Sequence, residues 1–185
     1  MFLGSEEIKR LIIEENLVSN YVDLDTQLQP DGFDLTVNKI EEYCSAGIIL
    51  KDTKFLPVMK EIELTNCIMT GFDNPELTNK TKDLGARKIW YLHKGVYLLY
   101  FNEEIKLPKS ISAIHIQRST LARCGSFSIV GTWDMGYNGK GCTMIEVCNP
   151  HGLVLEKNTR IVKMHFITVA GEGKLYNGSY QKENL

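Results

Sequence analysis

Two arginines and a hydroxyl residue stand close together in the segment 118–123, which reads Arg-Ser-Thr-Leu-Ala-Arg. If a helical turn begins at Ser119, its first backbone N–H groups lack intrahelical partners and lie at the positive end of the helix dipole. Arg123 is four residues further on and shares a face with Ser119, while Arg118 approaches from the side. This set could bind a triphosphate, because each charge-assisted hydrogen bond contributes about 1.5–3 kcal/mol. A solvated helical connector explains the segment equally well.

A second group of polar and aromatic residues lies between Trp133 and Gly139. Its two glycines predict a tight β-hairpin whose free amides and carbonyls could read the edge of a base. Tyr137 offers a flat face to a sugar, and its bulk would exclude a 2′-hydroxyl. Asp134 could accept a hydrogen bond from a 3′-hydroxyl and polarise a water as a general base, a role worth about 10²–10⁴ in rate. Taken alone, the stretch is better explained as an ordinary β-turn.

Glu146 is a third candidate, because strand alternation places it on one face with Met144 and Cys148, opposite Ile145 and Val147. A carboxylate between apolar neighbours loses solvation of its charged form, which suits an acid–base group. The pattern alone favours the alternative, an edge or interface glutamate that pairs with a cation.

Other polar residues give weaker signals. Asp34 follows a Pro-Asp-Gly turn and lies on the expected polar side of a half-buried strand, which is typical of a turn or edge residue. His115 and His165 lie on strands without a metal-ligand pattern, so structural roles are favoured. Lys163 could reach phosphate, although a solvated lysine explains it as well. The composition of the tail, residues 170–185, predicts disorder.

The elements that must position these residues are mostly strands. Residues 5–16 read as a short amphipathic helix with Ser5 as its N-cap. Strand signals recur through the rest of the chain with frequent turns, and Val162, Met164 and Phe166 alternate with residues of the opposite face. This pattern predicts an all-β sandwich, jelly roll or barrel. With 185 residues the chain is most simply one domain, residues 1–185.

Composition excludes several classes of protein. The net charge of −2 gives no global field that would attract nucleic acid or an anionic membrane, so phosphate recognition must come from local cations. Five cysteines without a Cys-x-x-Cys pair argue against a disulfide framework and a zinc site, and free thiols suit a reducing cytoplasm. The N-terminus does not read as a signal peptide, and no apolar run is long enough for a membrane span.

Five motifs in a fixed order connect these residues. The chain resembles the trimeric dUTP diphosphatase and dCTP deaminase superfamily at residues 29–35, 118–123, 133–137, 160–163 and 180–181. It looks most similar to archaeal-type dUTP diphosphatases, which share the Leu-Asp-Thr-Gln sequence at 24–27 and the Tyr-Gln-x-Glu-Asn ending at 180–184. The resemblance implies a distorted β-barrel or jelly roll with short helices at the N-terminus and after Arg118. It also implies hydrolysis of dUTP to dUMP and diphosphate, which keeps uracil out of DNA.

The resemblance further implies a homotrimer with active sites between subunits and Mg²⁺ bound through the triphosphate of a pyrimidine deoxynucleotide. It assigns Arg118, Ser119 and Arg123 to the phosphates, and Asp134 and Tyr137 to the deoxyribose. Asp134 would also orient the water that attacks the α-phosphate. Asp34 would act through metal-bound water, and the tail would close over the nucleotide. The remaining expected substrate-binding residues are Thr120, Gly131, Thr132, Trp133, Lys163, Tyr176 and Gln181.

The chain departs from the superfamily's motifs in three places. Lys163 stands where the superfamily often has glutamine, and Ser179 where deaminases have a phosphate-binding lysine. Glu146 falls three residues before an asparagine, like the catalytic glutamate of dCTP deaminases, but the stretch from Asp134 is two residues longer than theirs. The resemblance therefore leaves open a dCTP deaminase, or a bifunctional enzyme, that uses Glu146. A catalytically idle nucleotide sensor on the same fold is the third hypothesis.

Overall fold

The computed structural model describes residues 1–68, 75–81 and 85–185. Strands dominate this part of the chain, which confirms the predicted all-β class. The helices are short: α1 (Ser5–Glu15), α2 (Leu24–Gln27), α3 (Pro75–Thr81) and α4 (Ser119–Arg123). In the described ranges, no helix is long and apolar enough to cross a membrane.

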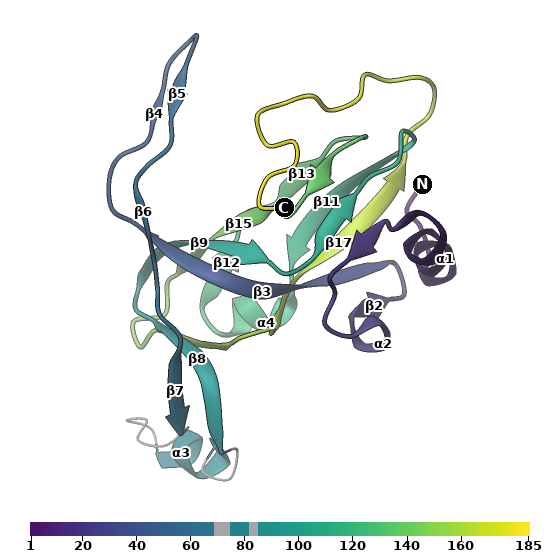
Figure 1. Ribbon diagram of the computed structural model, residues 1–185. Helices are drawn as coiled ribbons and strands as arrows, with labels where there is room; N and C mark the ends of the chain where they lie inside the picture. The colour runs from purple at the N-terminus through teal and green to yellow at the C-terminus, as the bar shows by residue number, and fades with distance from the viewer. Residues whose placement is uncertain (69–74, 82–84) are drawn as a thin grey trace.

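The largest sheet is antiparallel and curls back on itself (Figure 1). Its strands run in the order β12 (Ser126–Ser128), β15 (Cys142–Val147), β9 (Gly95–Phe101), β3 (Gly32–Tyr43), β17 (Arg160–Thr168), β11 (Ile111–Gln117) and β13 (Gly131–Trp133), with β2 (Leu28–Gln29) and β6 (Met59–Glu61) also paired to β3. The first and last strands of this path, β12 and β13, are separated in sequence only by Ile129 and Val130. The two ends of the sheet must therefore lie close together, as in a distorted barrel.

Smaller sheets extend this body. The first joins β1 (Val18–Ser19), β10 (Glu104–Lys106) and β14 (Asn138–Gly139), and the second joins β16 (Leu153–Glu156), β8 (Ala86–Leu92) and β7 (Thr65–Ile68). The pair β4 (Ile48–Ile49) and β5 (Lys54–Phe55) forms an arm that projects away from the body (Figure 1).

The core lies inside the curl of the sheet. On β17, Val162, Met164 and Phe166 are fully buried, as the alternation predicts, and they meet Phe33 and Leu35 of β3. Burial of each such side chain contributes about 1.5–3 kcal/mol. The prediction that β3 is half buried is wrong for its first residues, because Gly32–Val37 is buried on both faces. Helices α1 and α2 contact β3, so Asp34 does not lie at a solvated edge.

Two local predictions also need correction. Helix α1 has Gly4 as its N-cap, not Ser5, and the cap makes no side-chain hydrogen bond. The stretch from Trp133 to Gly139 is not a β-hairpin, because β13 pairs with β11 while β14 pairs with β10 in another sheet. A single turn connects the two strands.

Candidate functional site

A cavity of about 470 Å³ lies beside the turn between β13 and β14. It contains six of the residues that the sequence predicts for nucleotide binding or catalysis: Gly131, Thr132, Trp133, Asp134, Tyr137 and Tyr176. Leu98 and Tyr100 of β9 and Cys142 of β15 form part of its wall. The walls are largely apolar, and the Asp134 side chain is exposed at the rim. These features fit a sugar or base better than a phosphate.

The turn holds Asp134 and Tyr137 in fixed positions. The Tyr137 N–H donates to the carbonyl of Asp134 (3.1 Å), and Gly136 has a φ of +80°. Glycine suits this position, because a type II turn requires positive φ at its third residue. Leu107 fixes the turn from outside: its N–H donates to the Tyr137 carbonyl (2.8 Å), and its own carbonyl accepts from Gly136 (3.2 Å).

Three aromatic rings form one side of the cavity. Trp133 and Tyr137 meet edge to face with centroids 4.9 Å apart, and Tyr137 meets Tyr176 at 5.7 Å. The Tyr137 hydroxyl donates to Glu183 Oε1 (2.8 Å), and burial raises the pKa of Tyr137 well above its usual range. The Tyr137 ring therefore presents a neutral, rigid surface, as packing against a sugar requires.

His115 of β11 also lines this cavity beside Trp133, and its place on a strand without a metal-ligand pattern predicted only a structural role. Trp133 Nε1 donates to His115 Nδ1 (2.8 Å), so the neutral ring carries its proton on Nε2, which faces Thr143 Oγ1 (3.2 Å). Thr143 Oγ1 in turn donates to the Ile129 carbonyl (3.3 Å). A Cβ at position 131 would lie 2.2 Å from His115 Cε1, so glycine is required there. His115 thus fixes Trp133, the residue next to Asp134.

The burial of His115 makes a prediction about pH. Burial lowers the pKa of His115 from 6.5 to about 4. The unfolded chain therefore binds this proton more readily, and stability falls as pH drops from about 6.5 towards 4. The loss should reach roughly 3 kcal/mol, at 1.36 kcal/mol per pKa unit. Denaturant unfolding of wild type and His115→Gln between pH 7 and 4 measures it. An equally steep loss in the variant would contradict the assignment.

A second cavity, of about 360 Å³, is lined by the side chains of Arg118 and Arg160. It is lined by Val22, Thr26, Gln27, Thr36, Arg118, Thr120, Asn158, Thr159 and Arg160. Two guanidiniums and four threonine side chains suit an oxyanion such as a phosphate. The predicted helix is present as α4, with Arg118 at its N-cap in extended conformation. Arg160 belongs to the motif at residues 160–163, but the sequence did not predict that it binds substrate.

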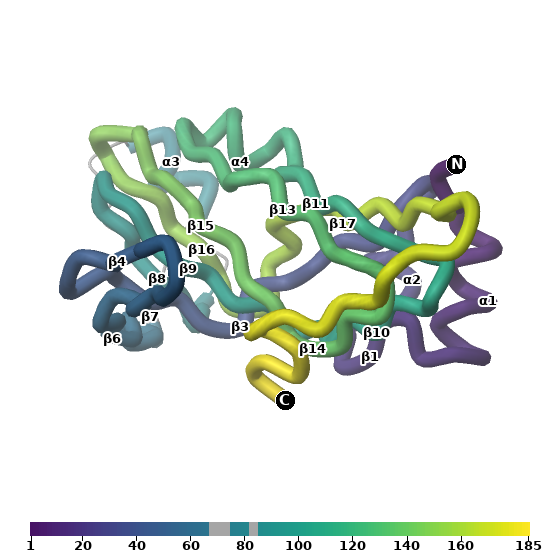
Figure 2. The backbone as a smooth tube through the Cα atoms, turned by 90° about the horizontal axis from the view of Figure 1, so that it is seen from above, coloured from purple at the N-terminus to yellow at the C-terminus, as the bar shows by residue number. Residues whose placement is uncertain are grey.

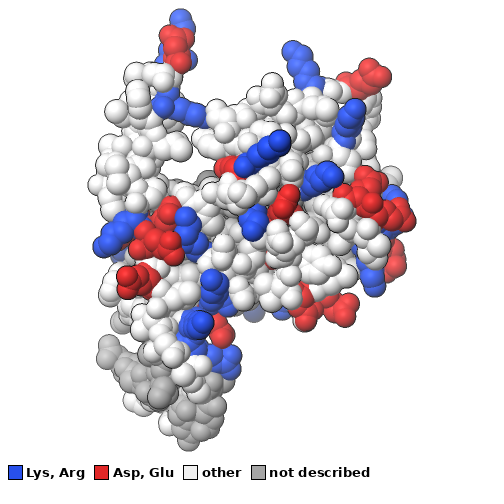
Figure 3. Space-filling view, in the orientation of Figure 1, with Lys and Arg blue, Asp and Glu red and all other residues white. Residues whose placement is uncertain are grey.

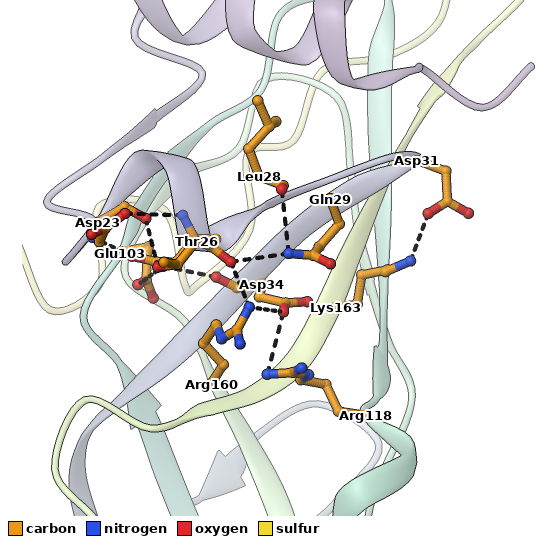
Figure 4. Close-up of polar contacts among 11 residues, drawn as sticks. Asp23, Thr26, Leu28, Gln29, Asp31, Asp34, Glu103, Arg118, Arg160 and Lys163 are labelled. Carbon is orange, nitrogen blue, oxygen red and sulfur yellow. Dashed lines mark hydrogen bonds and ion pairs between the residues drawn. The ribbon is translucent and has the colours of Figure 1, made fainter.

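Asp34 lies behind these arginines and contacts both (Figure 4). Its Oδ2 is 3.4 Å from Arg118 Nη1 and 3.3 Å from Arg160 Nη1. Burial raises the pKa of Asp34, although the positive charges of Arg118, Arg160 and Lys163 oppose this shift. Its other oxygen, Oδ1, is buried without a hydrogen-bond partner among the described residues. A buried carboxylate between two cations holds their guanidiniums in place at the cavity.

A buried polar network explains the Leu-Asp-Thr-Gln sequence at residues 24–27. The Gln27 side chain accepts from the N–H groups of Val22 and Asp23, and donates to the Asp34 carbonyl and to Glu103 Oε1. Glu103 is fully buried and accepts from Thr36 through both oxygens, and burial raises its pKa. This network fixes α2 against β3, and the carbonyl of Thr26 then accepts from Arg160 (Figure 4). Sequence reasoning missed Glu103 and the role of Gln27.

The remaining predicted residues lie outside both cavities. Ser119 and Arg123 are exposed on α4. Lys163 pairs with Asp31 (Nζ to Oδ1, 2.6 Å) on the far side of β17 from the core. Glu146 lies on the outward face of β15, between Phe127 of β12 and Val96 of β9, and its Oε1 accepts weakly from Cys148 Sγ (3.8 Å).

One protomer does not bring the two cavities together. In the pairing of β11 with β13, Ala113 lies opposite Trp133, so Asp134 is level with Ser112. Arg118 is six residues further along, which at about 3.3 Å per residue places it roughly 20 Å away. A deoxyribose and its α-phosphate are directly bonded, so groups that bind both must lie much closer together than this.

On the face shown in Figure 3, acidic and basic side chains are interspersed.

The tail runs back from β17 and passes beside β14 (Figure 2). Gln181 binds the backbone of the turn, with Nε2 donating to the Gly136 carbonyl (2.9 Å) and Oε1 accepting from the Asn138 N–H (2.9 Å). The tail is therefore bound to the protomer, contrary to the prediction from composition.

Comparison with known proteins identifies relatives that match most of this chain. The model of a family described as dCTP deaminase-like matches residues 2–169. A protein of Archaeoglobus fulgidus named "Probable deoxyuridine 5′-triphosphate nucleotidohydrolase" is 35% identical over 185 residues, which cover 99% of this chain and 97% of that protein. A protein of the same name from Aeropyrum pernix is 33% identical over 85% of this chain and 87% of its own.

A solved structure shows the same fold. The crystal structure of 2′-deoxycytidine 5′-triphosphate deaminase from Agrobacterium tumefaciens matches 91% of this chain with a TM-score of 0.61 and 19% sequence identity. The match covers 49% of that deaminase, so the present chain corresponds to about half of its length.

Proposed function

The chain belongs to the dCTP deaminase-like family, and on that basis we propose that it is a dUTP diphosphatase, which hydrolyses dUTP to dUMP and diphosphate. The observation that carries this proposal is the pair of cavities: one aromatic, with Asp134 at its rim, and one lined by Arg118 and Arg160. The relatives that are named for this activity align over nearly the whole chain, including both cavities.

Asp134 acts on the attacking water in this proposal. Its carboxylate accepts a proton from the water that attacks the α-phosphorus, and the bond between that phosphorus and the diphosphate oxygen breaks. Tyr137 packs against the deoxyribose and leaves no room for a 2′-hydroxyl. The rigid turn aims Asp134, because its backbone is held by Tyr137 and Leu107. The rate gain then comes from orientation together with proton transfer.

Arg118 and Arg160 bind the phosphates, with Thr120 as an additional donor. Ser119, Arg123 and Lys163 are further phosphate ligands in the proposal. Arg118 and Arg160 are each about one third exposed, so they can reach a ligand while Asp34 keeps them oriented. Guanidiniums bind phosphate oxygens through paired hydrogen bonds, and these become stronger as negative charge accumulates on the leaving diphosphate.

Mg²⁺ is the proposed cofactor. Within the described residues no group of three acidic, histidine or cysteine side chains could hold an ion by itself, which fits an ion carried mainly by the triphosphate. The unpartnered Oδ1 of Asp34 would be the acceptor for a water of such an ion. When bound, Mg²⁺ offsets phosphate charge during the displacement.

The roughly 20 Å between the cavities leads us to propose that each site forms between two copies in a homotrimer. One copy supplies the arginine cavity and the next supplies Asp134 and Tyr137, a heterologous contact that closes into a ring. Exposed apolar side chains lie near the sheet ends that would meet, with Phe127, Ile129 and Val130 between 41% and 58% exposed. We expect the assembled enzyme in the cytoplasm, where its exposed cysteines remain reduced.

Deamination of dCTP is the second candidate activity, and Glu146 is the residue that favours it. Glu146 lies in the apolar surface beside Phe127, so a trimer contact would bury it and could bring it to a neighbour's nucleotide. If the protein deaminates dCTP, Glu146→Gln should lower ammonia release by at least about 10²-fold and change dUTP hydrolysis by less than about tenfold. Equal losses in both assays would contradict separate roles.

Incubating the protein with dUTP and dCTP, and measuring diphosphate and ammonia separately, tests the proposal. Diphosphate from dUTP without ammonia from dCTP is expected. Ammonia from dCTP would show that hydrolysis is not the complete activity. Tight binding of a non-hydrolysable dUTP analogue without turnover of either nucleotide would instead identify a nucleotide sensor.

A further inference from the structure

The C-terminal tail occupies the outer edge of the turn that borders the aromatic cavity. Its contacts follow the turn residue by residue: Tyr176 N–H donates to the Met135 carbonyl (2.8 Å), Lys182 N–H to the Asn138 carbonyl (2.7 Å), and Lys140 N–H to the Glu183 carbonyl (3.0 Å). A Cβ at position 139 would lie 3.2 Å from the Glu183 nitrogen, so the tail backbone approaches where glycine leaves room.

One side chain of the tail interrupts this backbone pairing. Gln181 accepts from the Asn138 N–H and donates to the Gly136 carbonyl, both at 2.9 Å. Its carboxamide therefore presents one donor and one acceptor side by side. A pyrimidine base presents the same pair, as N3–H and a ring carbonyl in uracil, or as the amino group and N3 in cytosine. The Gly136 carbonyl and the Asn138 N–H could bind either the Gln181 carboxamide or a pyrimidine base, but not both at once.

We infer that Gln181 stands in for the pyrimidine base in the unliganded protomer, and that a nucleotide must displace it from Gly136 and Asn138 to bind. The inference rests on the proposed function. It makes Gln181 an internal competitor of the base, because a base with an adjacent donor and acceptor recovers both hydrogen bonds that Gln181 gives up. Displacement of Gln181 also frees the tail, and the tail must be free before it can close over the phosphates.

Because Gln181 occupies the Gly136 carbonyl and the Asn138 N–H, the apparent affinity for nucleotide is lowered. Only the fraction of protein in which Gln181 has left these groups can bind nucleotide. Removing the carboxamide should therefore tighten the binding of a nucleotide that lacks the outer phosphates. A residue that only contacts bound substrate would have the opposite effect when removed. The sign of the change thus separates the two roles.

The test is calorimetric titration of full-length wild type, Gln181→Ala and Ser179→Ala with dUMP. Ser179 lies in the same tail and is exposed, so its variant is the matched control. We expect Gln181→Ala to bind dUMP about five- to tenfold more tightly, and Ser179→Ala to match wild type. In wild type, dUMP should also accelerate hydrogen exchange at the Lys182 and Lys140 amides while the Asn138 amide stays protected.

Weaker or unchanged dUMP binding by Gln181→Ala would overturn the inference, as would continued protection of the Lys182 amide when dUMP is bound. Failure of the proposed function would look different: neither wild type nor the variant would bind dUMP, and the inference would fail with it. Binding of dUMP by both proteins with equal affinity would defeat the inference alone.

Discussion

Replacing Asp134 with asparagine should lower kcat for dUTP hydrolysis by about 10²–10⁴-fold while changing the affinity for a non-hydrolysable dUTP analogue by less than about tenfold. Asparagine keeps the size of the side chain and its ability to bind a sugar hydroxyl, but it cannot accept a proton from water. Among the described residues, the Asp134 carboxylate has no hydrogen-bond or ion-pair partner, so the change leaves the turn intact.

Steady-state kinetics and analogue titration, measured on the same preparation, separate these two effects. Asp52→Asn is a matched control, because Asp52 is an exposed aspartate on the projecting β4–β5 arm. It should keep the wild-type rate. Unchanged turnover in Asp134→Asn would remove Asp134 from the mechanism, and a parallel loss of rate and analogue affinity would assign it to binding alone.

The fold was predictable because period-two alternation is a local signal. Along β17, Val162, Met164 and Phe166 face the core as their spacing requires, and the short helix after Arg118 begins where its residue types suggest. The burial of Asp34 was not predictable in this way. It depends on α1 and α2 covering β3, and a tertiary contact of this kind leaves no mark on the alternation of the strand itself.

The turn at Asp134 shows the same limit. Its glycines correctly indicate a reversal, but local sequence could not show that β13 and β14 pair with different partners. The hydrogen bonds of Leu107 decide the geometry, and Leu107 is more than 25 residues away in sequence. The tail differs from its compositional prediction for a related reason: the turn supplies the partners that the tail lacks by itself.

The residues that sequence reasoning missed act through distant partners. His115 binds Trp133 and Thr143, 18 and 28 residues away, and Glu103 binds Thr36 and Gln27, 67 and 76 residues away. No motif spacing reports such contacts. Both residues are buried polar groups with satisfied hydrogen bonds, and they position candidate site residues. Structure was therefore needed to identify the supporting network, whereas the motifs alone identified the candidate nucleotide-binding groups.

Mixing two inactive variants should restore activity if the site lies between copies. Arg118→Ala removes the phosphate-binding cation from one half of the site, and Asp134→Asn removes the base from the other half. In a trimer with head-to-tail contacts, a site is intact when its arginine comes from an Asp134→Asn copy and its aspartate from an Arg118→Ala copy. Random reassembly of an equal mixture makes about one quarter of the sites intact, because each of the two conditions is met half of the time.

We therefore expect the mixture, after unfolding and refolding together, to recover about one quarter of wild-type kcat from two parents that are each nearly inactive. Each variant refolded alone is the control, and sizing chromatography establishes that all samples have the same assembly. Recovery of activity would require that Arg118 and Asp134, roughly 20 Å apart within a protomer, meet across a contact between two copies. If both halves belonged to one protomer, every site in the mixture would carry one of the two lesions and activity would stay at the level of the parents.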